Sequence, residues 1–241
     1  MLINSRAIVL RTIKHSDSTL IVDAYTEKEG RRSFATNIPK TRKASIKKVL
    51  FSPMALLEIE WNDYGQAKLT RLKSARPAYI YESIPFSPAK MSQTMFLAEF
   101  LAAALRAPIA DEKIFEFAYT SMLWLDSTDA PSANFHIVFL LHLSSLLGLQ
   151  PNTEDFAPSR FFDMDNGAYQ TQTAATANAI APEEARHLPM LLKLKYSTAS
   201  KIRFTRLERS RMLKLIIQYY SIHIPSFPAL KSPDILREMF D

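Results

Sequence analysis

The period of the apolar residues changes near residue 80, and this change limits the folds that the chain can adopt. Before it, β-branched and apolar residues form short runs that alternate with polar positions, as strands do. After Pro77, Pro85 and Pro88, apolar residues recur at three-and-four spacing, as on the buried face of a helix. The chain therefore combines a small β-structure with a helical part, so its predicted fold class is α+β.

The β-rich part predicts a small barrel. Five short strands are expected, at positions 6–14, 19–26, 31–37, 54–61 and 66–73. Polar turns separate most of them, and a polar, basic loop at 39–48 lies between the third and fourth strands. A sheet this small leaves exposed edges unless it closes on itself. Five strands with a loop after the third are typical of an OB-fold barrel.

Helices are predicted in the rest of the chain, at positions 91–106, 111–126, 132–147 and about 206–222. Asp111 and Ser132 occupy N-cap positions, and Gly148 follows a helix end. Pro182 suits the first turn of a further helix, and a last short helix is expected at 233–240.

Two domains follow from this pattern. We predict an OB-fold nucleic-acid-binding domain at 1–79 and an all-helical domain at 80–241. The helical domain contains an irregular insertion at about 152–181, rich in Asn, Thr, Ala and Gln. This insertion has room for one small hairpin, formed by 161–163 and 168–170.

Residues that enzyme chemistry needs are scarce. The chain has no cysteine and only four glycines, which excludes a thiolate metal site and a glycine-rich phosphate loop. No two histidines have the four-residue spacing with which a helix presents both to one metal, and His136 and His142 favour structural roles. Asp163 and Asp165 favour a turn over a calcium site. We predict no enzyme activity, catalytic residue, cofactor or metal.

Basic residues gather in two parts of the chain. Residues 1–77 hold 15 Lys or Arg against 7 Asp or Glu, a net charge of +8, whereas residues 78–241 have a net charge of −2. Within the second part, residues 193–214 alone have a net charge of +7. Such islands attract polyanions, of which nucleic acid is the commonest large one in a cell. The alternative is a solvated surface without a partner.

The first island predicts a strip that follows a DNA backbone, because its members lie on the third strand or in the loop after it. They are Arg31, Arg32, Lys40, Arg42, Lys43, Lys47 and Lys48. Tyr64, in a turn, is the candidate for stacking on a base, an interaction of about 1–3 kcal/mol. Phe34 and Phe51 are expected in the barrel core instead.

The second island has two possible uses besides solvation. Its members are Lys193, Lys195, Lys201, Arg203, Arg206, Arg209 and Arg211. Arg209 and Arg211 are two residues apart and point to different sides of a helix, so one face cannot hold all of them. The island either extends the DNA surface or frames an apolar groove for an acidic, hydrophobic peptide of a partner protein.

Several segments resemble the RecO family of recombination-mediator proteins. The opening RAIVLRTIKHSDSTLIV at 6–22, followed by YTEKEG at 25–30, is similar to the start of that family. The basic loop PKTRK at 39–43 stands where the family has its basic loop, and NFHIVFLLHLSSLLGLQP at 134–151 resembles its central helix. The ending YYSIHIPSFPALKSPDILREMF at 219–240 is similar to the family's C-terminal signature.

The resemblance implies an N-terminal OB-fold, a helical C-terminal domain, annealing of complementary single strands and loading of the RecA recombinase in DNA repair. The implied partners are single-stranded and double-stranded DNA, RecR, and the acidic C-terminal tail of the single-stranded-DNA-binding protein. Many family members also bind zinc through four cysteines in the segment that matches 160–181. This chain has none of these cysteines, so we predict no metal there.

The sequence leaves one alternative function open and also predicts a cellular location. The rival is a protein-binding adaptor that recruits repair partners through its helical domain and has only incidental DNA contact. The apolar run at 7–10 ends at Arg11 and is too short for a secretory signal. The apolar stretch at 137–149 falls short of the ~20 residues that cross a bilayer, so we expect a cytoplasmic, nucleoid-associated protein without membrane contact.

Overall fold

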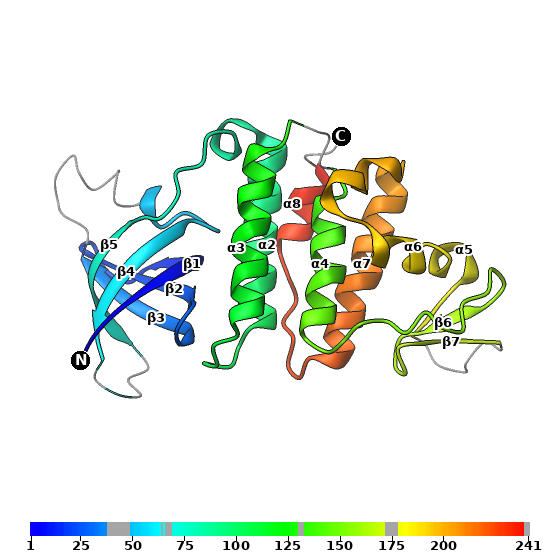
Figure 1. Ribbon diagram of the computed structural model, residues 1–241, viewed down its shortest axis with the longest axis horizontal. Coiled ribbons are helices and arrows are strands. Elements are labelled where there is room, and N and C mark those ends of the chain that lie inside the picture. Colours follow the sequence, from blue (N-terminus) through cyan, green and yellow to red (C-terminus); the bar gives the residue numbers. More distant parts are fainter. Residues whose placement is uncertain (38–48, 64, 66–68, 130–132, 172–177, 239–241) are drawn as a thin grey trace. The chain divides into compact units, whose positions relative to one another are not determined.

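The computed structural model of the protein describes residues 1–37, 49–63, 65, 69–129, 133–171 and 178–238 (Figure 1). The chain forms two compact units. Unit 1 comprises Met1–Ser127 and Leu230–Leu236, and unit 2 comprises Thr128–Ala229 and Arg237–Asp241. The predicted domain boundary at residue 79 stays a prediction.

Unit 1 begins with the predicted barrel of five strands. These are β1 (Leu2–Lys14), β2 (Thr19–Thr26), β3 (Gly30–Asn37), β4 (Leu56–Asn62) and β5 (Thr70–Pro77). The strand order around the closed barrel is β1, β2, β3, β5, β4, and β3 pairs with β5 in parallel while the other neighbours are antiparallel. A closed five-stranded barrel followed by helices confirms the α+β class and the OB-type architecture.

Strand β1 closes the barrel because it pairs with two neighbours. Its first half pairs with β4, from Leu2 to Ile8, and its second half pairs with β2, from Ala7 to Lys14. The register with β2 shifts between Val9 and Arg11. Such a bulge bends a strand and turns the side chains after it, so this 13-residue strand can pair with a different neighbour along each half.

The barrel interior is filled by apolar side chains from all parts of this sheet. Phe34 and Trp61 pack with their ring centroids 5.2 Å apart, and Phe51 is also buried. The core positions predicted for Phe34 and Phe51 are therefore confirmed. Trp61 is fully buried as well.

Unit 1 continues with helices after the barrel. They are η1 (Ile84–Phe86), α2 (Pro88–Ala104) and α3 (Glu112–Ser127), together with the part of α8 (Ser232–Glu238) up to Leu236. The Asp111 carboxylate accepts the backbone N–H of Ile114 at 3.0 Å, which confirms the predicted N-cap of α3. The first turn of α8 is fixed in unit 1 because Glu99 on α2 accepts the backbone N–H of Ser232 at 2.8 Å.

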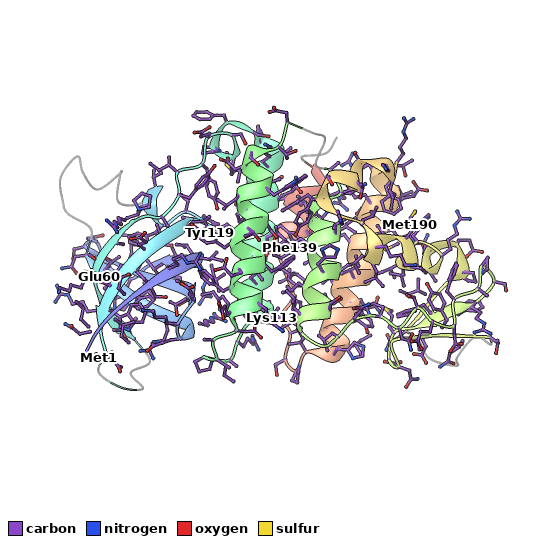
Figure 2. The ribbon with its side chains drawn as sticks, in the orientation of Figure 1. Met1, Glu60, Lys113, Tyr119, Phe139 and Met190 are labelled. Atoms are coloured by element: carbon purple, nitrogen blue, oxygen red, sulfur yellow. The ribbon has the colours of Figure 1, made fainter. Side chains whose placement is uncertain are left out.

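Arg6 joins the barrel to α3. Its guanidinium binds Glu27 on the barrel at 2.6 Å and Glu116 on α3. The same group lies 5.2 Å from the ring centroid of Phe115 and 5.0 Å from that of Tyr119, which faces the barrel (Figure 2). The bond to Glu27, followed by that to Glu116, raises the pKa of Arg6 despite burial. Two carboxylates and two rings thus hold one side chain between strand and helix.

Asp126, at the end of α3, holds the segment that leaves the barrel. Its carboxylate accepts the backbone N–H groups of Glu82, Ser83 and Ile84, each at 2.9 Å. Burial raises the pKa of Asp126, but these backbone hydrogen bonds lower it by more, so the pKa lies below its usual value. The carboxylate therefore supplies hydrogen-bond acceptors to the start of η1, whose first N–H groups have no partner within the helix.

Unit 2 is mainly helical with one small sheet. Its elements are α4 (Phe135–Leu146), β6 (Phe161–Asp163), β7 (Ala168–Gln170), β8 (Ala179–Ile180), α5 (Pro182–Ala185), α6 (Leu188–Lys193), η2 (Tyr196–Lys201) and α7 (Arg206–His223). Helix α4 begins at Phe135, and the predicted cap Ser132 lies outside the described residues. Gly148 follows α4 with a φ of +70°, as predicted for the residue after a helix end.

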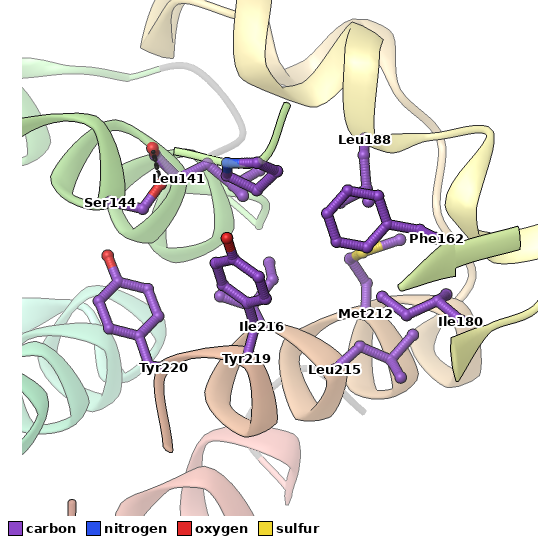
Figure 3. Close-up of a pocket in the computed structure, with 11 residues that line it drawn as sticks. Leu141, Ser144, Phe162, Ile180, Leu188, Met212, Leu215, Ile216, Tyr219 and Tyr220 are labelled. Carbon is purple, nitrogen blue, oxygen red and sulfur yellow. Dashed lines mark hydrogen bonds between the residues drawn. The ribbon is translucent and has the colours of Figure 1, made fainter. Parts of the chain in front are cut away.

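A small apolar cavity lies in the core of unit 2 (Figure 3). Leu141 of α4, Phe162 of β6, Leu188 of α6 and Tyr219 of α7 all line it. Nearby, the buried Tyr220 hydroxyl donates to the Leu140 carbonyl at 2.6 Å. Four elements that are distant in sequence therefore share one apolar core, which explains why α4 and α7 are apolar on their inward sides.

The predicted hairpin in the irregular insertion is confirmed, with β8 as an additional third strand. The strand order is β7, β6, β8. The buried Asp163 organises the turn, because its carboxylate accepts the backbone N–H of Asp165 at 2.9 Å and the side-chain amides of Asn166 at 2.7 Å and Gln170 at 2.8 Å. Burial raises the pKa of Asp163, and the hydrogen bonds from Asn166 and Asp165 outweigh it, so the pKa is lowered.

This turn lies in the segment where many members of the resembled family have four zinc-binding cysteines. The chain has no cysteine, and among the described residues no three His, Asp or Glu side chains are grouped to hold a metal. The donors that are present do not fit a structural zinc site. Asp163 on β6 instead accepts hydrogen bonds from Asn166 in the turn and from Gln170 on β7, which hold the hairpin together.

Within the described part of the chain, no helix is both long and apolar enough to span a bilayer.

Replacement of Asp163 by alanine is expected to destabilise unit 2 by about 1–3 kcal/mol, because several buried donors lose their shared acceptor. Urea unfolding and hydrogen exchange of 161–180 would measure this loss. Treatment of the wild-type protein with a chelator should leave the unfolding midpoint unchanged. A midpoint that falls with chelator would contradict a hydrogen-bonded, metal-free turn.

Candidate nucleic-acid interface

The outer face of β1, β2 and β3 carries two rows of cross-strand neighbours. Alternate residues of β2, such as Leu20 and Val22, belong to the barrel core, so the residues between them point outward. One outward row consists of Arg11, Asp23 and Ser33. The other consists of Ile13, Ile21 and Ala35 and continues to Arg71 on β5. We call these two rows the open face.

Helices α2 and α3 cover the neighbouring part of the same outer face. The Tyr25 ring stacks on Phe115 of α3 at 6.4 Å, and its hydroxyl accepts the backbone N–H of Asp111 at 3.2 Å. Arg31 donates to the Ala102 carbonyl at the end of α2, at 2.7 Å. The helices therefore cover the outer face only as far as Asp23, and the open face stays accessible toward the turn between β1 and β2.

Apolar groups lie in the middle of the open face and cations lie around them. Ile13 is 40% exposed, although it is a large aliphatic residue on a strand. The Arg11 side chain is 57% exposed. Arg71 and Lys73 on β5 are also exposed, and neither forms an ion pair with a described residue. Apolar contact for bases beside cations for phosphates suits single-stranded nucleic acid.

The sequence did not single out these three cations. Arg71 and Lys73 alternate with apolar residues in the fifth predicted strand, which is a signal for an outward-facing pair. Arg11 and Ile13 are two residues apart in the first strand and share a face, but the bulge after Val9 decides which face this is.

Two of the predicted DNA-binding residues have intramolecular partners. Arg31 lies 3.4 Å from Asp23 and donates to Ala102, and Arg32 lies 3.0 Å from Glu29. Their side chains are only 21% and 15% exposed. Both therefore stabilise unit 1, and their contact with DNA stays a prediction.

The other predicted residues of the first island lie outside the described residues. They are Lys40, Arg42, Lys43, Lys47, Lys48 and Tyr64. The last described residue before the basic segment is Asn37, which pairs with Thr19 at the start of β2. Strand β3 therefore ends beside the same β1–β2 turn toward which the open face extends.

The second predicted island divides into two groups. Arg209 donates to the Asn134 side chain at 3.0 Å and to the Phe204 carbonyl at 3.1 Å, and burial lowers its pKa. Arg211 forms an ion pair with Glu184 on α5. The remaining five members are exposed: Lys193, Lys195, Lys201, Arg203 and Arg206. Arg211 is exposed too, with 66% of its side chain accessible, so Arg209 is the one partly buried member of the seven.

Exposed apolar side chains accompany these cations in unit 2. The His187 ring packs edge-on against Phe204 at 5.2 Å, which brings the start of α6 next to the residues that precede α7. Met190, three residues after His187 and labelled in Figure 2, is 46% exposed. Leu207, three residues after Phe204, is 78% exposed. Apolar groups bordered by cations match the alternative of an acidic, hydrophobic peptide.

One of the histidines predicted to be structural, His136, lies on α4 in unit 2. His136 is fully buried, and burial, with a smaller contribution from the Arg209 charge, lowers its pKa to about 3. A histidine with so low a pKa stays neutral at physiological pH. Its burial confirms the structural role expected for His136.

Two family models match successive parts of the chain. Residues 1–81 match the family described as "Recombination protein O N terminal", and residues 86–233 match "Recombination protein O C terminal". The protein named DNA repair protein RecO in Phocaeicola vulgatus is 40% identical over 240 residues and covers 100% of both chains. The proteins of that name in Bacteroides fragilis and Flavobacterium johnsoniae are 40% and 33% identical, again over 100% of both chains. The chain therefore belongs to the RecO family of DNA repair proteins.

Proposed function

We propose that this RecO protein binds single-stranded DNA without sequence preference and anneals complementary strands. The observation that supports this most directly is the open face, where Ile13 and Ile21 lie among exposed cations on an OB-type barrel. Aliphatic and backbone contacts of this kind accept any base, because they read no hydrogen-bonding pattern. Lys40, Arg42 and Lys43, which follow β3 in the sequence, add to the positive charge of the same part of the chain.

Annealing needs more than binding, because two phosphate backbones must approach each other. The net charge of +8 on residues 1–77 lowers that repulsion. The exposed cations of unit 2 offer a second surface for single-stranded or double-stranded DNA. Binding to both surfaces should depend steeply on salt, because each neutralised phosphate releases counterions.

We further propose that the protein works with partners in repair. The family implies RecR and the single-stranded-DNA-binding protein, with loading of the RecA recombinase on DNA coated by that protein. Arg203 and Arg206 beside the exposed Leu207 suit an acidic, apolar tail. No step of this role needs bond-making chemistry, so we propose a mediator without enzyme activity, located in the cytoplasm with the nucleoid.

The replacements Lys40→Glu, Arg42→Glu and Lys43→Glu are expected to slow annealing of two complementary labelled oligonucleotides at least about tenfold at low salt, because three phosphate contacts become repulsive. The difference should shrink at higher salt. A matched variant with Lys193→Glu, Lys195→Glu and Lys201→Glu has the same change in charge and measures the contribution of unit 2. If wild-type protein did not accelerate annealing at either salt, the adaptor function would replace the proposed one.

The variant Arg203→Glu, Arg206→Glu is expected to lose most of its affinity for an acidic, hydrophobic peptide while it keeps its affinity for a short thymidine oligonucleotide. Fluorescence anisotropy with labelled peptide and labelled oligonucleotide compares the two affinities directly. An unchanged affinity for the peptide would contradict the assignment of these residues to partner binding.

A further inference from the structure

A buried carboxylate holds the most central cation of the open face. Asp23 Oδ2 lies 2.7 Å from Arg11 Nη2, and Asp23 Oδ1 accepts the Ser33 hydroxyl at 2.6 Å. The Asp23 side chain is 5% exposed, whereas that of Arg11 is 57% exposed. The cation can therefore be reached by a ligand, and the anion that holds it cannot.

The bulge in β1 produces this arrangement. Without the register shift between Val9 and Arg11, the side chains of the second half of β1 would project to the opposite face. With the shift, Arg11 stands directly opposite Asp23 and Ile13 opposite Ile21. The bulge thus places one cation and one aliphatic group on the open face together.

Asp23 does not depend on Arg11 alone. If Arg11 turns away, the carboxylate keeps the hydrogen bond from Ser33 and the guanidinium of Arg31, at 3.4 Å. Arg31 itself is fixed by the carbonyl of Ala102. Departure of Arg11 therefore leaves no unpaired buried charge, which is the main cost when one partner of a buried pair is removed.

The Asp23 carboxyl carries the negative charge that its ion pair with Arg11 requires. Burial raises the pKa of its carboxyl, and the Ser33 hydrogen bond together with the Arg11 and Arg31 charges lowers it by more. The pKa lies below its usual value, so the group is an anion at neutral pH. A carboxylate and a phosphate oxygen offer a guanidinium equivalent charge-assisted hydrogen bonds.

We propose that Asp23 competes with DNA phosphates for Arg11 and so restrains the affinity of the open face for single-stranded DNA. The inference rests on the proposed function, because it requires phosphates at the open face. On binding, Arg11 exchanges one anion for another, so this contact adds little net attraction. Such a restraint favours release of the strand, which an annealing protein needs once the duplex has formed.

Replacement of Asp23 by asparagine should tighten binding of a thymidine oligonucleotide roughly fourfold at low salt, since one nearby negative charge is removed. The slope of log affinity against log salt should become steeper by about 0.7, the value for one more neutralised phosphate of a single strand. The matched control is Glu58→Gln, which removes a carboxylate that accepts from Arg76 at 2.8 Å elsewhere on the barrel. This control should change neither the affinity nor the slope appreciably.

Combination of Asp23→Asn with Arg11→Gln separates competition from a general effect of charge. The gain in affinity should disappear in the double variant, because the released group is Arg11. A gain that survives in the double variant, or one no larger than that of Glu58→Gln, would overturn the proposal. A purely structural role of Asp23 would lower the unfolding midpoint without changing the salt slope.

A measurement on the wild-type protein avoids any folding defect of the variants. The side-chain Nε–H signal of Arg11, identified by its loss in Arg11→Gln, should shift when the oligonucleotide is added, whereas that of Arg31 should stay. An Arg11 signal that stays in place while the DNA is bound would overturn the competition. Absence of any salt-dependent DNA binding would instead overturn the proposed function itself.

Discussion

The pairing of β1 with two neighbours is the constraint on which the rest of unit 1 depends. A strand that serves β4 with its first half and β2 with its second must bend, and the bulge after Val9 supplies the bend. Closure then buries Trp61 and Phe34 in one core and leaves β1, β2 and β3 with a continuous outer face. The same bulge turns Arg11 and Ile13 outward, so a requirement of barrel closure also determines which side chains can meet a ligand.

The helices divide this outer face into a structural half and an accessible half. Arg6 binds α3, and Arg31 binds the end of α2, so both arginines have intramolecular partners. Asp23 lies at the border, where it contacts both Arg31 and the exposed Arg11. Cations on one small barrel therefore differ in function according to their partners, and a count of Lys and Arg cannot distinguish them.

Local pattern was sufficient to predict the barrel, the long helices and the hairpin of β6 and β7, because each depends on the period of apolar residues and on turn residues near in sequence. The short helix α6 and the 3₁₀ turn η2 were not predicted, since their apolar residues are fixed by packing on α4. The partners of Arg31, Arg209 and Arg211 were also beyond prediction. Ala102, Asn134 and Glu184 lie 71, 75 and 27 positions away, and only the folded chain brings them close.

We propose that single-stranded DNA lies on the open face. Methyl NMR of the isoleucine residues tests it directly, because Ile13 and Ile21 belong to that face while Ile59 lies in the barrel core and Ile216 in unit 2. Addition of a short thymidine oligonucleotide should shift the Ile13 and Ile21 signals, and added salt should reverse the shift. Unchanged Ile13 and Ile21 signals, under conditions where the oligonucleotide is bound, would contradict the account.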